Sequence, residues 1–169
     1  PGDALAATLK VESGPGFGRN HADSLVFSPA VTTIVTSGVL LPARYDTLDG
    51  ALPGGGRVRL LFSGVAALNA ALFLDYVQYA VEPDQIRIRN LEIEGFTADC
   101  IRGAGVRDSE FTNLRLRQCG QNGIRLTHRA RNPSGNKIGG GAGLGNEIRE
   151  QFEFGIRIDP GISPEQPGL

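Results

Sequence analysis

Three segments in the second half of the chain share one pattern, and this internal repeat constrains the fold more than any other feature of the sequence. Each copy begins with an aliphatic residue, which is followed eight positions later by Ile and then by Arg. The copies are residues 93–102, 116–125 and 148–157, so that the first two begin 23 positions apart and the last two 32. The nine extra residues are expected to form a loop insertion at 131–136 and at the glycines of 139–141.

A period near 23 residues, filled by several short strands, is the length of one coil of a β-solenoid. One coil cannot bury its own apolar face, whereas coils stacked about 4.8 Å apart share a continuous core. A leucine-rich repeat has a similar period, but the sequence lacks its LxxLxLxxN pattern and its helices. The sequence therefore predicts an all-β parallel solenoid with inward columns of aliphatic side chains. Two of these columns are Ile93, Leu116 and Ile148, and Ile101, Ile124 and Ile156.

The chain divides into three regions. Residues 1–40 are atypical of the repeat and contain the only plausible helix, at 3–10, so we expect them to cap the N-terminal end. Residues 41–158 are expected to form the coils, and residues 159–169, with three prolines and two glycines, an irregular tail or linker. The expected strands are at 25–27, 32–36, 39–41, 57–62, 71–77 and 86–93.

The last repeat copy is followed by no comparable cap. We therefore expect further coils or another subunit to cover it in the native protein. The chain contains no Met, so we also expect it to begin after a processing site or to be a piece of something larger.

Two stretches resemble known bacterial proteins. The phrase NKIGGGAGLGNEI at 136–148, together with NGIRL at 122–126, resembles the rungs of right-handed parallel β-helix repeat proteins of the pectin-lyase-like fold. The segments ADSLVFS at 22–28, TIVTSG at 33–38 and TLDG at 47–50 resemble the N-terminal region of CSLREA-type exported surface proteins, although the CSLREA hexapeptide itself is absent. The resemblance implies right-handed coils and an extracellular or cell-surface location.

That fold also includes polysaccharide-cleaving enzymes, so we looked for their chemistry. The family phrases NTD, DD, GHG and RIK do not occur, and the RxPxxR phrase begins at Arg131 but lacks its second arginine. Two carboxylate pairs, Glu92/Glu94 and Asp108/Glu110, have i, i+2 spacing and are expected on the solvated face of strands. We predict no catalytic residue, no cofactor and no metal site.

The remaining candidate residues have ordinary interpretations. His21 and His128 lie in loops without a nucleophile motif, and the glycines from 139 to 143 lack the P-loop signature, which favours a tight corner. Cys100 and Cys119 have neither metal-ligand nor redox spacing. We expect two buried, reduced cysteines, with a disulfide as the alternative.

Stacking of the repeat copies also predicts columns of charge. Glu94 should lie one coil from Arg117 and form an ion pair with it. Arg102, Arg125 and Arg157 should stack as three like charges, and they are the candidate ligand-binding residues. We expect local carboxylates to neutralise this column, with an acidic glycan as the alternative partner. The candidate carboxylates are Asp99, Glu153 and Asp159.

These observations favour a non-catalytic extracellular β-helix module of a bacterial surface or secreted protein. Its role would be adhesive or that of a fibre or stalk, with a polysaccharide or surface glycan as partner. A polysaccharide lyase or glycoside hydrolase and a phage-like tail-spike component are the alternatives. The net charge of −1 gives no argument for nucleic acid, and no apolar run approaches the roughly 20 residues of a membrane-spanning helix.

Overall fold

The protein is all-β in the computed structural model of the chain. The model describes residues 9–12, 24–36, 46–62, 70–75, 84–129, 131–159 and 161. Apart from the short 3-10 helix η1 (Pro53–Gly55), the regular elements in these ranges are strands.

The prediction of a helix at 3–10 is wrong for residues 9 and 10, the part of this segment that the structure describes. Leu9 and Lys10 belong to strand β1 (Leu9–Glu12), which pairs with the edge of a sheet. Backbone pairing at that edge outweighs the helical propensity of the Ala- and Leu-rich stretch. Residues 3–8 and the strand expected at 39–41 lie outside the described residues.

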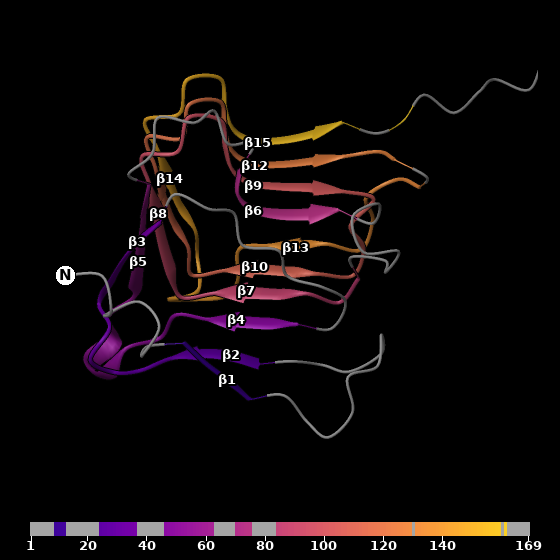
Figure 1. Cartoon of the computed structure of the whole chain (residues 1–169). Coiled ribbons are helices and arrows are strands. Elements are labelled where there is room, and N and C mark those ends of the chain that lie inside the picture. Colours follow the sequence, from indigo (N-terminus) through magenta and orange to yellow (C-terminus); the bar gives the residue numbers. More distant parts are fainter. Residues whose placement is uncertain are drawn as a thin grey trace, which may run out of the picture.

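The strands form three sheets (Figure 1), and every pairing is parallel except that of β1 with β2. Sheet A contains, in order, β1, β2 (Ser24–Phe27), β4 (Thr47–Asp49), β7 (Arg87–Arg89), β10 (Glu110–Thr112) and β13 (Lys137–Ile138). Sheet B contains β3 (Thr33–Thr36), β5 (Val58–Phe62), β8 (Leu91–Glu94), β11 (Arg115–Arg117) and β14 (Glu147–Arg149). Sheet C contains β6 (Ala70–Asp75), β9 (Asp99–Ala104), β12 (Asn122–Thr127) and β15 (Phe154–Asp159).

Along the chain, successive strands belong to sheets A, B and C in turn, and this order repeats. We call each set of three consecutive strands, one from each sheet, a layer. Layer 1 is β4, β5 and β6, layer 2 is β7, β8 and β9, layer 3 is β10, β11 and β12, and layer 4 is β13, β14 and β15. In Figure 1 the strands of sheets A and C form two rows that sheet B joins on the left. Strands β2 and β3 extend sheets A and B beyond layer 1.

The predicted register is confirmed. Leu116 pairs with Ile93 on one side and with Ile148 on the other. Ile124 likewise pairs with Ile101 and Ile156. The repeat therefore aligns equivalent residues of layers 2, 3 and 4 in straight columns.

The core is fully buried in layers 2 and 3 and open at layer 4. Ile93, Leu116 and Ile124 are 0% exposed, whereas Ile156 is 46% and Ile158 53% exposed. These side chains occupy equivalent columns, so the difference comes from the missing layer above β15 among the described residues.

The insertion between the second and third repeat copies is divided between two loops. Lys137 pairs with Glu110, which lies 27 positions earlier, and Glu147 pairs with Arg115, which lies 32 positions earlier. Relative to the 23-residue period, four extra residues therefore precede β13 and five more lie between β13 and β14. The second loop is a corner, as expected, and Gly139 and Gly143 have φ values of 93° and 78° that favour glycine there.

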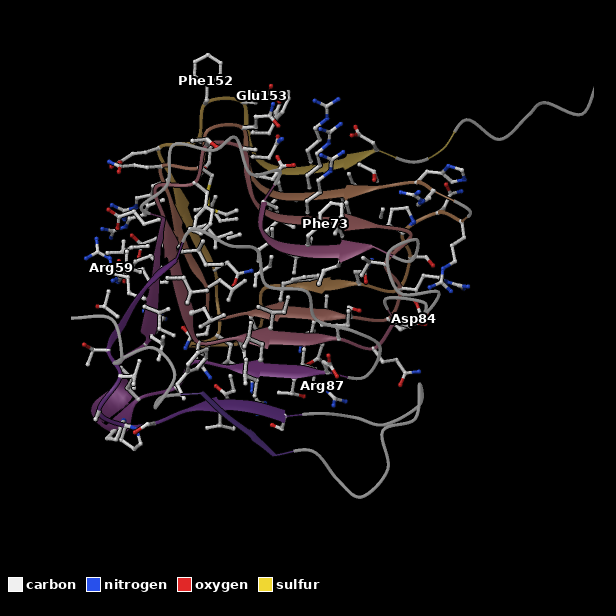
Figure 2. All side chains as sticks on the ribbon, viewed as in Figure 1. Arg59, Phe73, Asp84, Arg87, Phe152 and Glu153 are labelled. Carbon is white, nitrogen blue, oxygen red and sulfur yellow. A yellow bond between two sulfur atoms is a disulfide. The ribbon has the colours of Figure 1, made fainter. Side chains whose placement is uncertain are left out.

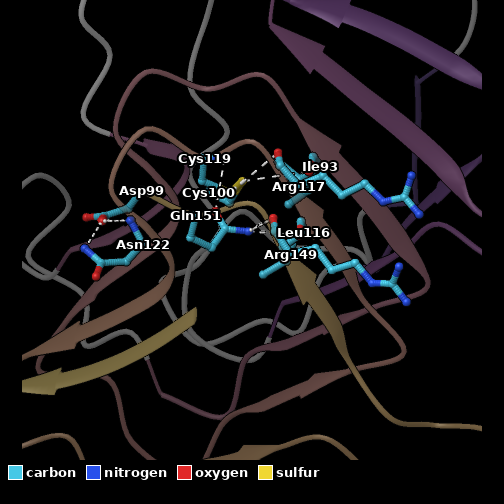
Figure 3. The surroundings of a disulfide bond; sticks show 9 residues. All are labelled: Ile93, Asp99, Cys100, Leu116, Arg117, Cys119, Asn122, Arg149 and Gln151. Carbon is cyan, nitrogen blue, oxygen red and sulfur yellow. Dashed lines mark hydrogen bonds between the residues drawn. A yellow bond between two sulfur atoms is a disulfide. The ribbon is translucent and has the colours of Figure 1, made fainter. Parts of the chain in front are cut away.

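Cys100 and Cys119 form a disulfide, so the expectation of two reduced cysteines is wrong. Both are buried, and their Cα atoms lie 5.4 Å apart. Cys100 lies in β9 of layer 2, and Cys119 lies in the turn that leads to β12 of layer 3 (Figure 3). They are 19 positions apart and not 23, so they belong to different columns, and the repeat alignment does not reveal their contact.

Candidate functional site

The three candidate arginines form one column on the outer face of sheet C. Arg125 pairs in register with Arg102 and with Arg157, so their strands β9, β12 and β15 carry one arginine each. All three are partly exposed. The next position down the column is Phe73 in β6, labelled in Figure 2, and the Arg102 guanidinium lies 5.8 Å from the centre of its ring.

Carboxylates neutralise two of these three arginines, as expected. Asp159 accepts hydrogen bonds from Nε of Arg125 at 3.2 Å and from Nε of Arg157 at 2.8 Å. Glu153 lies 3.6 Å from Nη1 of Arg157. The hydrogen bond from Arg157, followed by that from Arg125, holds the pKa of Asp159 below its ordinary value against the opposing effect of desolvation. Both arginines are therefore held in a local ion-pair cluster.

Asp99, the third candidate carboxylate, has another role. It is fully buried, and its Oδ1 accepts hydrogen bonds from the backbone N–H and the side-chain amide of Asn122 at 3.1 and 2.6 Å (Figure 3). Its Oδ2 has no hydrogen-bond partner, and neither has Oδ1 of Asn122. Asp99 thus links layer 2 to layer 3 beside the disulfide and makes no direct ion pair with the arginines.

Arg102 differs from the other two arginines. No carboxylate among the described side chains pairs with it, and its recorded contact is with the face of Phe73. An arginine over an aromatic ring keeps its donors available while the ring fixes its position. Phe73 and Arg102 therefore form the part of the column best suited to an anionic ligand.

The outer face of sheet B carries a second charged array. One column alternates in sign from layer 1 to layer 4, through Arg59, Glu92, Arg115 and Glu147. The distances along it are 3.5 Å from Arg59 to Glu92, 3.2 Å from Glu92 to Arg115 and 3.0 Å from Arg115 to Glu147. We call this column the charge ladder.

The predicted ion pair between Glu94 and Arg117 is wrong, although the two residues are register partners. Glu94 pairs instead with Arg59, and Arg117 pairs with Glu147 at 3.2 Å. Nε of Arg149 also lies 3.0 Å from the Glu147 carboxylate, so this one carboxylate forms ion pairs with three arginines. Each residue forms its ion pair with a diagonal neighbour instead of its register partner, because long side chains reach across the sheet face.

The two carboxylate pairs lie in different surroundings. Glu92 and Glu94 lie on the outer face of sheet B, as expected, and both are held by Arg59. The expectation that Asp108 and Glu110 lie on one strand is wrong. Glu110 begins β10, whereas Asp108 lies in the turn before it with a φ of 52°. Glu110 is half-exposed and lies 4.0 Å from Arg87.

The other candidate residues have structural roles or lie in loops. His128 is in the loop after β12, and its backbone N–H donates to the carbonyl of Asp159. Arg131 donates to the carbonyl of Gly105 and to the carboxylate of Asp84, so the start of the RxPxxR phrase braces two loops. His21 lies outside the described residues.

The sequence analysis missed three amide side chains of layer 4. Each accepts a hydrogen bond from a backbone N–H of a layer 3 turn and donates to the carbonyl three residues earlier. Asn136 bridges Ser109 and Val106, Asn146 bridges Leu114 and Phe111, and Gln151 bridges Cys119 and Leu116. The sequence does contain a signal for these amides. Polar residues 136, 146 and 151 align with buried positions 109, 114 and 119 of layer 3.

Comparison with family models, with curated proteins and with solved structures finds no match to this chain. Within the described ranges no group of three or more His, Cys, Asp or Glu residues is placed to hold a metal ion. In the same ranges, no helix has the length and apolar character needed to span a membrane.

Proposed function

We propose that the chain is a right-handed parallel β-helix that serves as a non-catalytic module of a secreted or surface-exposed bacterial protein. The observation that carries this proposal is the stacking of layers 1 to 4 in three parallel sheets with one register. Such a stack is stiff, because each layer is hydrogen-bonded to its neighbours along all three sheets. A stiff stack suits an adhesive element or a stalk.

The placement of charge supports a scaffold role over catalysis. A general acid and a general base need carboxylates that face one substrate with separated pKa values. Here Glu92, Glu94 and Glu147 are held by arginines of sheet B, and Asp159 by arginines of sheet C. These carboxylates stabilise the stack, and their ion pairs restrict proton transfer to a substrate.

The disulfide supports an extracellular location. A disulfide persists in oxidising compartments and is rare in the reducing cytosol. Cys100 and Cys119 join two successive layers and are both buried. Together with the resemblance to exported β-helix proteins, this bond favours a protein that works outside the cytoplasm.

An acidic polysaccharide fits the outer face of sheet C best. Arg102 stands over Phe73 without a carboxylate partner among the described side chains. An aromatic ring beside a guanidinium offers an apolar face for a sugar ring and two donors for its carboxylate. We therefore place the glycan contact at these two residues, at the lower end of the arginine column.

A panel of acidic and neutral polysaccharides, scored for both binding and cleavage, tests this function. We expect binding to acidic chains only, weakened at least about tenfold by Arg102→Gln or Phe73→Ala, and no new reducing or unsaturated ends. Arg87→Gln is the matched control, since Arg87 is an exposed arginine on sheet A. Cleavage that disappears in Glu92→Gln or Glu110→Gln would favour the lyase or hydrolase alternative. Unchanged polysaccharide binding by Arg102→Gln would show that the glycan contact is not at Arg102 on sheet C.

A further inference from the structure

Layer 4 ends in an exposed apolar surface, which we call the terminal face and define by Leu144, Ile148, Phe152, Ile156 and Ile158. Phe152 is 85% exposed, and Leu144, Ile156 and Ile158 are each about half-exposed. A hollow of about 370 Å³ lies between Ile148 and Ile156. We propose that this face binds the terminal face of a second copy of the chain across a two-fold axis.

The edge strand β14 is self-complementary in charge. A two-fold axis through Ile148 pairs two copies of β14 in antiparallel fashion, so that residues equally far from Ile148 face each other. Glu147 of each copy then faces Arg149 of the other, and both lie on the outer face of sheet B. The side chain of Arg149 is 67% exposed, so it is free to reach the Glu147 carboxylate of the other copy while it stays near its own, and the two charges alternate in sign across the axis.

The same axis matches the exposed apolar residues. Leu144 and Phe152 lie four positions before and four after Ile148. Each Phe152 therefore meets the corner that carries Leu144 of the other copy. In Figure 2 Phe152 points away from the ribbon at the end formed by layer 4, where no described residue covers it. The corner at Leu144 contains Gly141, Gly143 and Gly145, which leave open space for a ring.

The two ends of the stack also favour this arrangement over head-to-tail stacking. Among the described strands, all three sheets end together at layer 4, with β13, β14 and β15. At the other end the described strands form steps, because sheet A continues to β1, sheet B to β3, and sheet C stops at β6. Strand β1 is also antiparallel to its neighbour. A level face fits a second level face better than it fits a stepped one.

This inference is independent of the proposed glycan contact, because it uses residues of layer 4 and of sheet B only. Its first test is the mass of the 169-residue chain across a dilution series, by light scattering or sedimentation. We expect a dimer of the 17.9 kDa chain that dissociates on dilution. Arg149→Glu should weaken the dimer at least about tenfold, since it places like charges opposite Glu147. Arg87→Glu, which changes the same charge on sheet A, should leave the dimer intact.

The second test fixes the register. Directly opposed residues of an antiparallel pair have Cα atoms about 4.5–5.5 Å apart, which is within reach of a disulfide. Mild oxidation of Ile148→Cys should therefore give a covalent dimer. Val35→Cys, an exposed position on β3 at the opposite end of sheet B, is the matched control and should remain uncrosslinked. Circular dichroism confirms that each variant is folded.

Three results would overturn the inference. One is a chain that stays monomeric at every concentration, and another is a dimer that Arg149→Glu leaves unchanged. The third is a mass that grows without limit on concentration, because that behaviour indicates head-to-tail stacking.

Discussion

Leu116 shows how a single residue depends on the layers above and below it. Its side chain is 0% exposed because Ile93 and Ile148 occupy the same column in the neighbouring layers. In a stack of layers of this kind, the side chains of one layer alone bury no residue. The free energy of burying Leu116, about 2–3 kcal/mol, is therefore a property of three layers.

Replacing Leu116 with Asp should abolish cooperative unfolding. The change places an unpaired carboxylate in the centre of the stack, at a cost of about 4 kcal/mol or more. Thermal unfolding followed by circular dichroism measures the effect. Gln118→Asp is the control, because Gln118 is exposed and its φ of 50° is one that Asp tolerates. If Leu116→Asp unfolded at the temperature of the parent chain, the inward column would be assigned to the wrong residues.

The disulfide is a residue-scale bond between two layers. Cys100 and Cys119 are 19 positions apart, and the loop that they close includes β10, β11 and the turns around them. Closing a loop of this length lowers the entropy of the unfolded chain by an amount worth about 3 kcal/mol. Replacing both cysteines with Ala should therefore lower the free energy of unfolding by about 3 kcal/mol, as measured by urea titration.

The control for that experiment is the parent chain with a reducing agent. If reduction alone lowers the stability of the parent to that of the double variant, and leaves the double variant unchanged, the loss belongs to the bond. Equal stability of the parent and the double variant without a reductant would contradict the prediction. That result would mean that contacts other than the crosslink, such as the bond from the Cys119 N–H to Gln151, hold this turn.

At the scale of elements, the sequence predicted the contacts between residues that are one repeat period apart. The columns at Ile93 and Ile101 follow from pattern alone, because each strand must turn the same residues inward as the strand below it. The pattern could not give contacts that cross columns. The disulfide depends on where the chain bends at a corner. The pairing of Glu94 with Arg59 depends on which diagonal neighbour a long side chain reaches across the sheet. Corner geometry is set by turn conformation, which the period does not encode.

The charge ladder of sheet B makes the stack sensitive to acid. Hydrogen bonds from Arg115 and then Arg117 hold the pKa of Glu147 below its ordinary value of 4.5. A carboxylate with a lowered folded-state pKa contributes stability above its unfolded pKa and loses it as the pH falls through the folded pKa. The Glu147 contribution should therefore be complete at neutral pH and decline below about pH 4.5.

Melting temperatures of the parent and of Glu147→Gln across this range measure that contribution as a difference. We expect the variant to melt lower at neutral pH and the two curves to converge under acid conditions. Glu150→Gln is the control, since Glu150 is exposed and forms no ion pair among the described side chains. A difference between parent and Glu147→Gln that is constant with pH would show that the lost stability is not electrostatic.

At the scale of the whole molecule, the layers differ in how many neighbouring layers cover them. Each layer contacts only its neighbours, so the local stability of a layer depends on whether it has one neighbour or two. Layer 3 has two, and its inward side chains Leu116, Ile124 and Leu126 are fully buried. Among the described residues layer 4 has layer 3 as its single neighbour, and its equivalent residues are Ile148, Ile156 and Ile158. The three amides at Asn136, Asn146 and Gln151 fasten layer 4 to the turns of layer 3, but they add no apolar burial.

Hydrogen exchange in dilute solution should therefore show a gradient along the stack. Amides of β13, β14 and β15 should exchange at least about tenfold faster than those of β8, β9, β11 and β12, because layer 4 can open while layers 2 and 3 stay paired with each other. Replacing Gln151 with Ala, which removes the bond to the Cys119 turn, should steepen the gradient at β15 and leave β8 unchanged. Raising the protein concentration should slow exchange in β14 most, because the inferred two-fold contact is centred on Ile148. Uniform exchange from layer 2 to layer 4 would contradict the gradient, since the stack would then open as one cooperative unit whose stability does not depend on the number of neighbours.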